Sequence, residues 1–255
     1  MKGTVYLVGA GPGAPDLLTL RAARLLAEAD IVFYDALVHP ETVALAERAQ
    51  KIAVGKRCGK HSTAQQFINK RLVDAARRHR VVVRLKGGDP MLFGRAQEEI
   101  AALEAAGTPC EVVPGITAAL AAAAELRTSL TQRGSARSVT FATPRVGANE
   151  PDSTWAAGLR AADAGAIYMG AGEAARIART LLAAGKSPGL PVAVVESASL
   201  PEQRICYTTL SDLPAFVRAT VTGPALILIG PQFRAHATAA AEAERCCEDS
   251  RTATG

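Results

Sequence analysis

The chain has 255 residues, of which 49% are hydrophobic and 21% are charged, and its formal net charge is +5. This length corresponds to one large domain or two ordinary ones. No basic stretch carries the interleaved aromatics on which nucleic-acid bases stack, so the positive charge favours a small acidic substrate over a nucleic acid. No apolar run reaches the roughly 18 residues of a membrane helix and no signal-peptide pattern is present, which predicts a cytoplasmic protein without a membrane partner.

Short β-branched runs alternate with amphipathic segments rich in Ala, Leu and Arg through the first half of the chain. Such alternation is typical of a mainly parallel α/β sheet. Asp16 is the expected N-cap of the first helix. We expect strands at Val5–Val8, Ile31–Tyr34, Ile52–Val54, Val81–Leu85 and Glu111–Val113, and helices at Leu17–Ala29, Pro40–Arg48, Ala64–Arg78 and Gly94–Ala106.

The second half continues the α/β pattern but includes the run RICYTTL, which reads as an antiparallel element. We therefore expect two α/β domains, residues 1–113 and 114–235, followed by a tail at 236–255 whose composition favours fraying or disorder. The expected strands of the second domain are Ser138–Ala142, Ala166–Met169, Val192–Val195, Arg204–Thr209 and Ala225–Ile229.

The five cysteines favour neither a disulfide framework nor a metal site. Their number is odd, they are widely spaced apart from one adjacent pair, and no CxxC motif occurs. Cys110 and Cys206 lie in strand-like apolar stretches, so we expect them to be small core residues.

The stretch GAGPGAPD follows the first expected strand and has the glycine spacing of a dinucleotide-binding turn, with Gly9 and Gly11 in place. In a nicotinamide-binding fold, Asp35 would be the carboxylate that binds the ribose. Pro12 and Pro15, however, each lack the N–H that would hold a pyrophosphate. A rigid turn with few donors suits a ligand without phosphates, and the dinucleotide remains the weaker alternative.

A second glycine turn, Gly87-Gly88-Asp89-Pro90, follows the strand expected at Val81–Leu85, which we interpret as apolar. It opens onto the carboxyl edge of a parallel sheet, where α/β folds bind ligands. Standing alone it would be an ordinary turn, with Asp89 bonded to its own backbone.

Five segments occur in an order that resembles the tetrapyrrole methylases: VYLVGAGPGAPDLLTL, VGKRCGKHSTAQQFIN, RLKGGDPMLFGRAQEE, VVPGITAALAAAA and YMG. The resemblance extends from about Lys2 to Phe233 and is strongest to the branch that methylates uroporphyrinogen III. It implies a homodimer of two-domain α/β chains, each with a mainly parallel N-terminal sheet and a mixed C-terminal sheet. It also implies S-adenosyl-L-methionine bound in the interdomain cleft and S-adenosyl-L-homocysteine as its product.

The resemblance further implies methylation of uroporphyrinogen III at C2 and then C7, giving precorrin-2. Asp35 and Lys56 match a proton acceptor and a proton donor, and Arg95, Glu98 and Arg133 match the substrate region. The pKa of an arginine lies above about 12, so a carboxylate, Asp35 or Glu98, is the easier base, and we expect the arginines to bind substrate carboxylates. The residues that match cofactor contacts are Pro12, Gly87, Gly88, Asp89, Leu92, Thr117, Ala118, Met169, Ala198 and Ala225.

The sequence departs from the family pattern mainly on the substrate side. Ala14 replaces a common acidic residue, FGRAQEE replaces a more glycine-rich run, and Ser129 and Gln132 stand where proline and histidine are usual. A glutamine cannot titrate near neutral pH as a histidine does. Two alternatives therefore stay open: a methyltransferase for a later corrin-ring precursor, and a cofactor-binding protein that has lost turnover.

Overall fold

The structure is a computed structural model that describes residues 2–54, 61–146 and 153–234. The chain forms two compact units, residues 1–118 and 119–255. A parallel sheet in the first unit and a mixed sheet in the second confirm the expected fold class. The finer limits expected at 113/114 and 235/236 stay predictions.

The first unit is built on a five-stranded parallel sheet in the order β3-β2-β4-β1-β5. The inner strands β2, β4 and β1 are largely buried, as expected where helices cover both faces of a parallel sheet, whereas the edge strands β3 and β5 are not. The strands are β1 (Thr4–Gly9), β2 (Ile31–Tyr34), β3 (Gln50–Ala53), β4 (Val81–Lys86) and β5 (Cys110–Val113).

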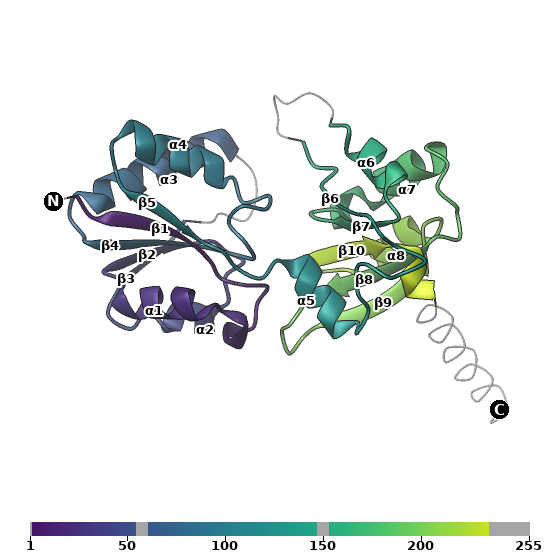
Figure 1. The fold of residues 1–255 in the computed structure, drawn as a ribbon, viewed down its shortest axis with the longest axis horizontal. Helices are drawn as coiled ribbons and strands as arrows, with labels where there is room; N and C mark the ends of the chain where they lie inside the picture. Colours follow the sequence, from purple (N-terminus) through teal and green to yellow (C-terminus); the bar gives the residue numbers. More distant parts are fainter. Residues whose placement is uncertain (1, 55–60, 147–152, 235–255) are drawn as a thin grey trace. The chain divides into compact units, whose positions relative to one another are not determined.

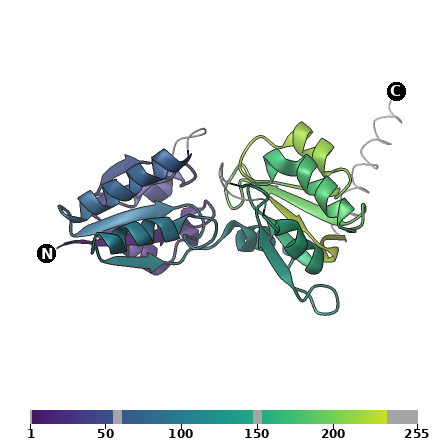
Figure 2. The ribbon, with the colours of Figure 1, turned by 90° about the horizontal axis from the view of Figure 1, so that it is seen from above.

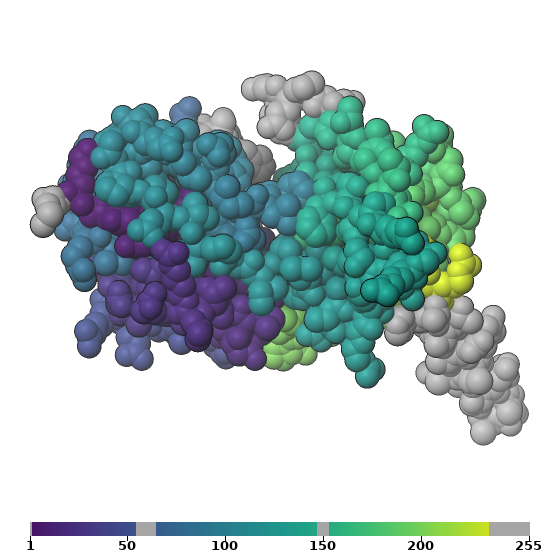
Figure 3. Space-filling model, in the orientation of Figure 1, coloured from purple at the N-terminus to yellow at the C-terminus, as the bar shows by residue number. Residues whose placement is uncertain are grey.

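Two pairs of helices cover this sheet (Figures 1 and 2). On one face Leu26 and Val43 pack with Val83, and on the other Leu72 and Leu103 belong to a separate core cluster. The space-filling view shows α1 and α2 in purple and α4 in blue-teal on opposite sides of the unit (Figure 3). The helices are α1 (Leu20–Glu28) and α2 (Pro40–Ala44) on the first face and α3 (His61–Ala76) and α4 (Ala96–Ala105) on the second.

The start of the first helix differs from the prediction. Pro15–Leu17 form a short 3-10 helix, and α1 begins only at Leu20. The Thr19 hydroxyl accepts the N–H of Ala22 at 3.1 Å, so Thr19 is the N-cap and the prediction for Asp16 was wrong. The reason is that Pro15 begins the separate 3-10 turn, which moves the start of the α-helix past the glycines and both prolines.

The second unit contains a five-stranded sheet in the order β6-β7-β10-β8-β9, in which β6 and β7 are parallel and the other pairs antiparallel. The antiparallel element expected at RICYTTL is confirmed as β9. Helices α6, α7 and α8 pack on one face and α5 on the other (Figure 1). The elements are α5 (Ala118–Glu125), β6 (Val139–Ala142), α6 (Trp155–Ala161), β7 (Ala164–Ile167), α7 (Ala174–Ala183), β8 (Pro191–Glu196), β9 (Arg204–Thr209), α8 (Leu213–Thr220) and β10 (Ala225–Ile229).

Three further expectations have a structural outcome. Strand β7 ends at Ile167 rather than Met169, because Met169 has a φ of +53°, outside the range of strand residues. Cys110 and Cys206 are half-buried rather than core residues, since both lie on edge strands, β5 and β9. Across residues 2–54, 61–146 and 153–234, no helix has the length and apolar character needed to cross a bilayer. The expected tail at 236–255 lies outside the described residues.

Candidate functional site

Three loops meet at the carboxyl edge of the parallel sheet, where β1, β4 and β5 end. Gly11 donates its N–H to the Gly88 carbonyl at 3.2 Å, and Gly88 donates back to Gly11 at 2.7 Å. The Asp89 carboxylate accepts the N–H of Gly115 at 2.9 Å through Oδ2 and that of Met91 at 2.8 Å through Oδ1. Asp89 therefore joins the loop after β4 to the loop after β5.

Close backbone packing explains why these loops carry glycine. A Cβ at Gly9 would lie 2.6 Å from the Gly115 Cα and 2.7 Å from the Gly88 carbonyl oxygen. Gly88 has a φ of +69°, and the nearest atom to a Cβ built there is the Thr117 Cα at 4.0 Å. The turn thus leaves an open space beside bare backbone, which fits a ligand approached by main-chain groups.

The residues expected to contact a cofactor in this unit lie around these loops. Gly87, Gly88 and Asp89 form the turn after β4, and the Leu92 N–H donates to the Asp89 carbonyl at 3.3 Å. Pro12 directly follows Gly11 and is half-buried. Thr117 and Ala118 come directly after the loop that ends β5, and Thr117 is the neighbour of Gly88 described above.

The other expected cofactor residues share one edge of the second sheet. Met169 follows β7, Ala198 follows β8, and Ala225 begins β10. Ala225 pairs with Glu196 and Ile227 with Ile167, so the antiparallel register brings all three positions to the same edge. Three non-glycine residues here have left-handed backbones, a conformation that costs about 1–3 kcal/mol each and clusters at functional sites: Met169 at +53°, Ser197 at +51° and Ser199 at +68°.

Asp35 follows β2 at the carboxyl edge of the first sheet, and its side chain is 30% exposed. Its Oδ1 lies 2.5 Å from Nη2 of Arg84, and the Nε of Arg84 lies 3.0 Å from Oε1 of Glu99. Lys86 places Nζ 3.0 Å from Oε2 of the same carboxylate. Arg84, Lys86 and Glu99 are all buried, so a compensated charged network lies directly behind Asp35.

Burial and neighbouring charge act on the two cations differently. Desolvation alone would lower the pKa of Arg84, but the charges of Asp35 and Glu99 hold that pKa above its ordinary value. The pKa of Lys86 is lowered, first by burial and then by the nearby Arg84 charge, with Glu99 opposing the shift. Arg84 is thus the stronger fixed cation of the network.

Sequence reasoning missed this network because it treated the strand before Gly87 as apolar. The signal was present: Arg84 and Lys86 are two residues apart in a strand, so both side chains point to one face. A buried strand with two cations on one face requires a carboxylate on the element that covers that face. Glu99 of α4 meets that requirement.

Arg95 and Glu98 form the ion pair that their spacing allowed. Nε and Nη2 of Arg95 lie 2.6 and 2.8 Å from the two carboxylate oxygens of Glu98, and the side chains are 41% and 49% exposed. Arg95 is the N-cap of α4 rather than a residue within it, with a left-handed φ of +55°. A substrate carboxylate binding to Arg95 would compete with Glu98 for this guanidinium.

Arg133 lies in an exposed turn before β6. Gln132 donates its N–H to the Ala136 carbonyl at 2.7 Å and accepts the Ser135 hydroxyl at 2.9 Å through Oε1. In this chain, therefore, Gln132 stabilises the turn that carries Arg133. The expected proton donor, Lys56, lies outside the described residues.

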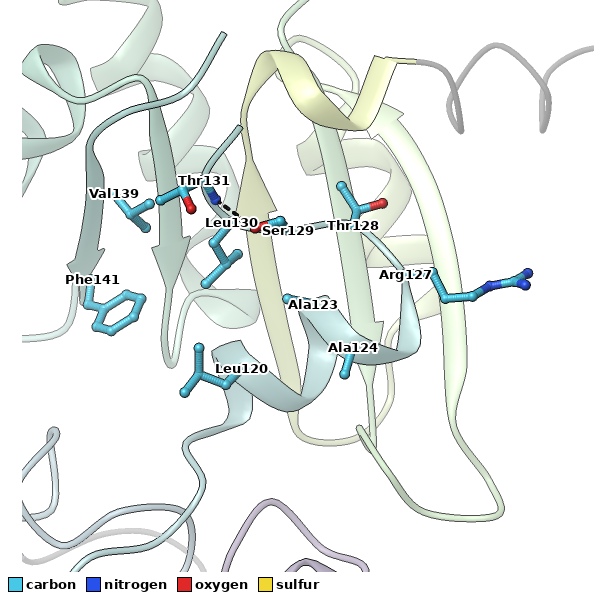
Figure 4. Close-up of a pocket in the computed structure, with 10 residues that line it drawn as sticks. All are labelled: Leu120, Ala123, Ala124, Arg127, Thr128, Ser129, Leu130, Thr131, Val139 and Phe141. Atoms are coloured by element: carbon cyan, nitrogen blue, oxygen red, sulfur yellow. Dashed lines mark hydrogen bonds between the residues drawn. The ribbon is translucent and has the colours of Figure 1, made fainter. Parts of the chain in front are cut away.

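An open groove of about 540 Å³ lies in the second unit between α5, the segment after it, and β6 (Figure 4). Leu120 and Phe141 border it, and the Thr131 N–H donates to the Ser129 hydroxyl at 3.3 Å on its rim. Arg127 points away from the hollow (Figure 4). The groove is largely apolar and contains none of the expected site residues, so its size does not make it the centre of the chemistry.

Comparison with known proteins adds independent information. The family model for tetrapyrrole (corrin/porphyrin) methylases matches residues 4–214. A siroheme synthase of Psychrobacter sp. (strain PRwf-1) is 46% identical over 236 residues, which are 92% of this chain and 48% of that protein. The chain therefore spans about half the length of the curated relatives it matches.

Solved structures of methyltransferases that act on tetrapyrroles are also similar to this chain. A uroporphyrin-III C-methyltransferase from Thermus thermophilus, complexed with S-adenyl homocysteine, is 40% identical with a TM-score of 0.78, covering 91% of this chain and all of that one. A cobalt precorrin-4 methyltransferase gives a TM-score of 0.79 at 30% identity, covering 89% of this chain and 94% of that one. The family match covers most of both units and includes the loops assembled above, and it shows that this chain belongs to the tetrapyrrole methylases.

Proposed function

We propose that this chain transfers methyl groups from S-adenosyl-L-methionine to C2 and C7 of uroporphyrinogen III, forming precorrin-2 by way of precorrin-1. The observation that supports this most is the agreement between two lines of reasoning. The family resemblance assigns cofactor contacts to the loops after β1, β4 and β5, and those loops meet around open, glycine-lined backbone. A solved relative is complexed with S-adenyl homocysteine, which supports a methyl donor of this chemical class.

The geometry fits a methyl donor that carries an adenosine and an amino acid but no phosphate. The first turn offers few amide donors because of Pro12 and Pro15, and Gly88 exposes its backbone to open space. When bound, the donor supplies an electrophilic methyl group on a sulfonium. Residues proposed to contact it are Pro12, Gly87, Gly88, Asp89, Leu92, Thr117 and Ala118 in the first unit and Met169, Ala198 and Ala225 in the second.

The protein's part of the reaction is orientation and proton removal. A carbon–carbon bond forms as the sulfur–methyl bond breaks, its electron pair stays on sulfur, and a proton leaves the macrocycle. Asp35 is the base in this proposal because its carboxylate is partly exposed while one oxygen is fixed by Arg84. Arg95 and Arg133 bind the carboxylates of the substrate. Glu98, which pairs with Arg95 in this structure, gives up that guanidinium when a substrate carboxylate binds. Lys56 is the proposed proton donor.

A methyltransferase acting on a later corrin-ring precursor is the second candidate, because the cobalt precorrin-4 methyltransferase has an equally high TM-score. Sequence identity separates the two branches where the fold does not: 40% against 30%. The exchange of histidine for Gln132 does not favour the second candidate either, since Gln132 has a clear role in forming its turn.

Anaerobic incubation with uroporphyrinogen III and methyl-labelled donor, followed by mass analysis of the tetrapyrrole, tests the proposal. We expect labelled product from uroporphyrinogen III and none from a precursor that already carries both methyl groups. Transfer to the methylated precursor alone would support the second candidate. Donor binding in a calorimeter without transfer to either would identify a protein that has lost turnover.

A further inference from the structure

The buried charges behind Asp35 are unusual for a sheet of this type. Glu99 has no exposed surface, and Arg84 and Lys86 are 2% and 3% exposed. Burying charged groups is costly even when they are paired, and an apolar replacement is often at least as stable. Stability alone therefore does not account for three buried charges on β4 and α4.

Arg84 connects Glu99 to Asp35 in a fixed direction. Its Nε donates to Glu99, its Nη2 donates to Asp35, and its Nη1 donates to the Leu85 carbonyl at 3.2 Å. Because the guanidinium is planar and rigid, holding the Nε edge against Glu99 sets the direction in which Nη2 meets Asp35. A substitution at Glu99 would consequently change the orientation of Arg84 and with it the position of the Asp35 carboxylate.

Glu99 is itself held by two further side chains. Lys86 binds its Oε2 and Gln65 of α3 donates to its Oε1 at 3.1 Å. Gln65 also donates to the Asn69 Oδ1 at 3.0 Å, and Asn69 donates to the backbone carbonyl of Glu98 at 3.2 Å. The same network thus joins α3, β4 and the end of β2 to the first turn of α4.

We propose that Glu99 is a positioning residue for the methyl-transfer reaction: acting through Arg84, it fixes Oδ1 of Asp35 and so orients the exposed part of that carboxylate toward the substrate. The inference rests on the proposed function. Glu99 is fully buried, so it acts on the reaction only through its neighbours and does not touch the substrate.

A double-mutant cycle tests this inference. Glu99→Gln keeps the shape of the side chain but removes its charge, and we expect kcat to fall roughly 10- to 100-fold, as misplacement of a reacting group typically causes. We expect KM for S-adenosyl-L-methionine to change less than about twofold, because the glycine loops are not part of the network. If Glu99 acts through Asp35, adding Glu99→Gln to Asp35→Asn will slow the reaction no further.

Additive losses in the double variant would overturn the inference, as would a fall in thermal stability with unchanged kcat. Arg84→Lys is the second variant, in case Glu99→Gln does not fold. It keeps the charge but cannot bridge two carboxylates with a planar fork, so we expect it to lower kcat in the same way. Wild-type kcat in Arg84→Lys would contradict the proposal. Glu104→Gln, on an exposed position of the same helix, is the matched control and should keep wild-type kcat.

A failure of the proposed function can be distinguished from a failure of the positioning inference. Wild-type protein that methylates neither substrate would refute the function before any variant is compared. The positioning inference would then be decided by crystal structures of the wild type and Glu99→Gln. Separation of Arg84 Nη2 from Asp35 Oδ1 in the variant would support it, and an unchanged contact would overturn it.

Discussion

Asp35 combines two properties that a general base needs. One carboxylate oxygen is fixed by Arg84, and the side chain is still 30% exposed at the edge where the loops after β1, β4 and β5 meet. Glu98, the other carboxylate considered as a base from the sequence, is instead paired through both oxygens with Arg95. At the level of single residues the structure therefore favours Asp35 as the proposed base.

Asp35→Asn should lower kcat about 100-fold or more, because the amide cannot accept the proton that the substrate loses. Binding of S-adenosyl-L-homocysteine, measured by calorimetry, should stay within about twofold of wild type, since the glycine loops are intact. Asp74→Asn, which changes an exposed ion-paired carboxylate on α3, is the matched control. Retained wild-type kcat in Asp35→Asn would exclude Asp35 as the base.

Cys110 should react slowly with alkylating reagents at neutral pH. Burial, followed by the charges of Glu99, Glu104 and Glu111, raises the pKa of its thiol to about 11, so the reactive thiolate is scarce at neutral pH. Alkylation of the Cys110 peptide, followed by mass spectrometry across a pH series, should increase toward a midpoint near that value. A midpoint near the ordinary thiol pKa of about 8.5 would contradict the environment described for β5.

Among whole elements, the sequence predicted the sheet well and the details of the site less well. All five strands of the first sheet occur close to the expected positions, because apolar, β-branched runs mark the inner strands clearly. The mostly exposed edge strand β3 is the least accurate, since it begins two residues before the expected Ile52. Three helix starts were displaced. The 3-10 turn at Pro15–Leu17 delays α1, the left-handed Arg95 delays α4, and α3 begins at His61, three residues before the expected start.

The spacing of Arg84 and Lys86 indicated that a buried carboxylate was required. Which residue supplies it depends on which faces of α3, α4 and β4 meet, and no local pattern specifies that.

Gly115→Ala tests the close packing of the loops. Its Cβ would overlap the Gly88 carbonyl and lie 2.8 Å from the Gly9 Cα, so the loops after β1 and β4 would have to move. We expect a loss of about 1–3 kcal/mol in unfolding free energy, by analogy with overpacked cores, together with weaker donor binding. Gly189→Ala is the control, because its Cβ would meet only the Ser187 hydroxyl at 3.9 Å. Equal effects in the two variants would contradict the packing argument.

Glu196 should make the second unit's stability depend on pH. Burial would raise its pKa, but hydrogen bonds from Arg204 and from the backbone of Thr222 and Gly223 outweigh burial and lower it. A lowered pKa stabilises the fold above the unfolded value of about 4.3, and that contribution is lost as pH falls through the folded value.

Glu196→Gln should therefore be less stable than wild type by about 1–3 kcal/mol at neutral pH, the usual contribution of hydrogen bonds to a charged group. Urea unfolding should show that this difference shrinks as the pH falls below about 4. A difference that stays constant down to acid pH would show that the carboxylate charge of Glu196 does not contribute.

At the scale of the whole molecule, both units contribute residues to the proposed donor contacts. The proposed donor contacts lie at the carboxyl edge of the first sheet and at the edge of the second sheet that carries Met169, Ala198 and Ala225. If both edges bind the donor, S-adenosyl-L-homocysteine should raise the unfolding temperature of the whole chain, by a stabilisation that grows with the logarithm of its concentration relative to Kd. The homodimer implied by the family resemblance stays a prediction, which sedimentation of the purified chain would check.

Counting the labelled methyl groups that the wild-type chain adds to uroporphyrinogen III under anaerobic conditions tests the proposed function more directly than any variant. The proposed function predicts two methyl groups per tetrapyrrole for the wild type and about 100-fold slower labelling by Asp35→Asn, while both proteins bind the donor. No methyl transfer by the wild-type protein, with the donor still bound, would contradict it.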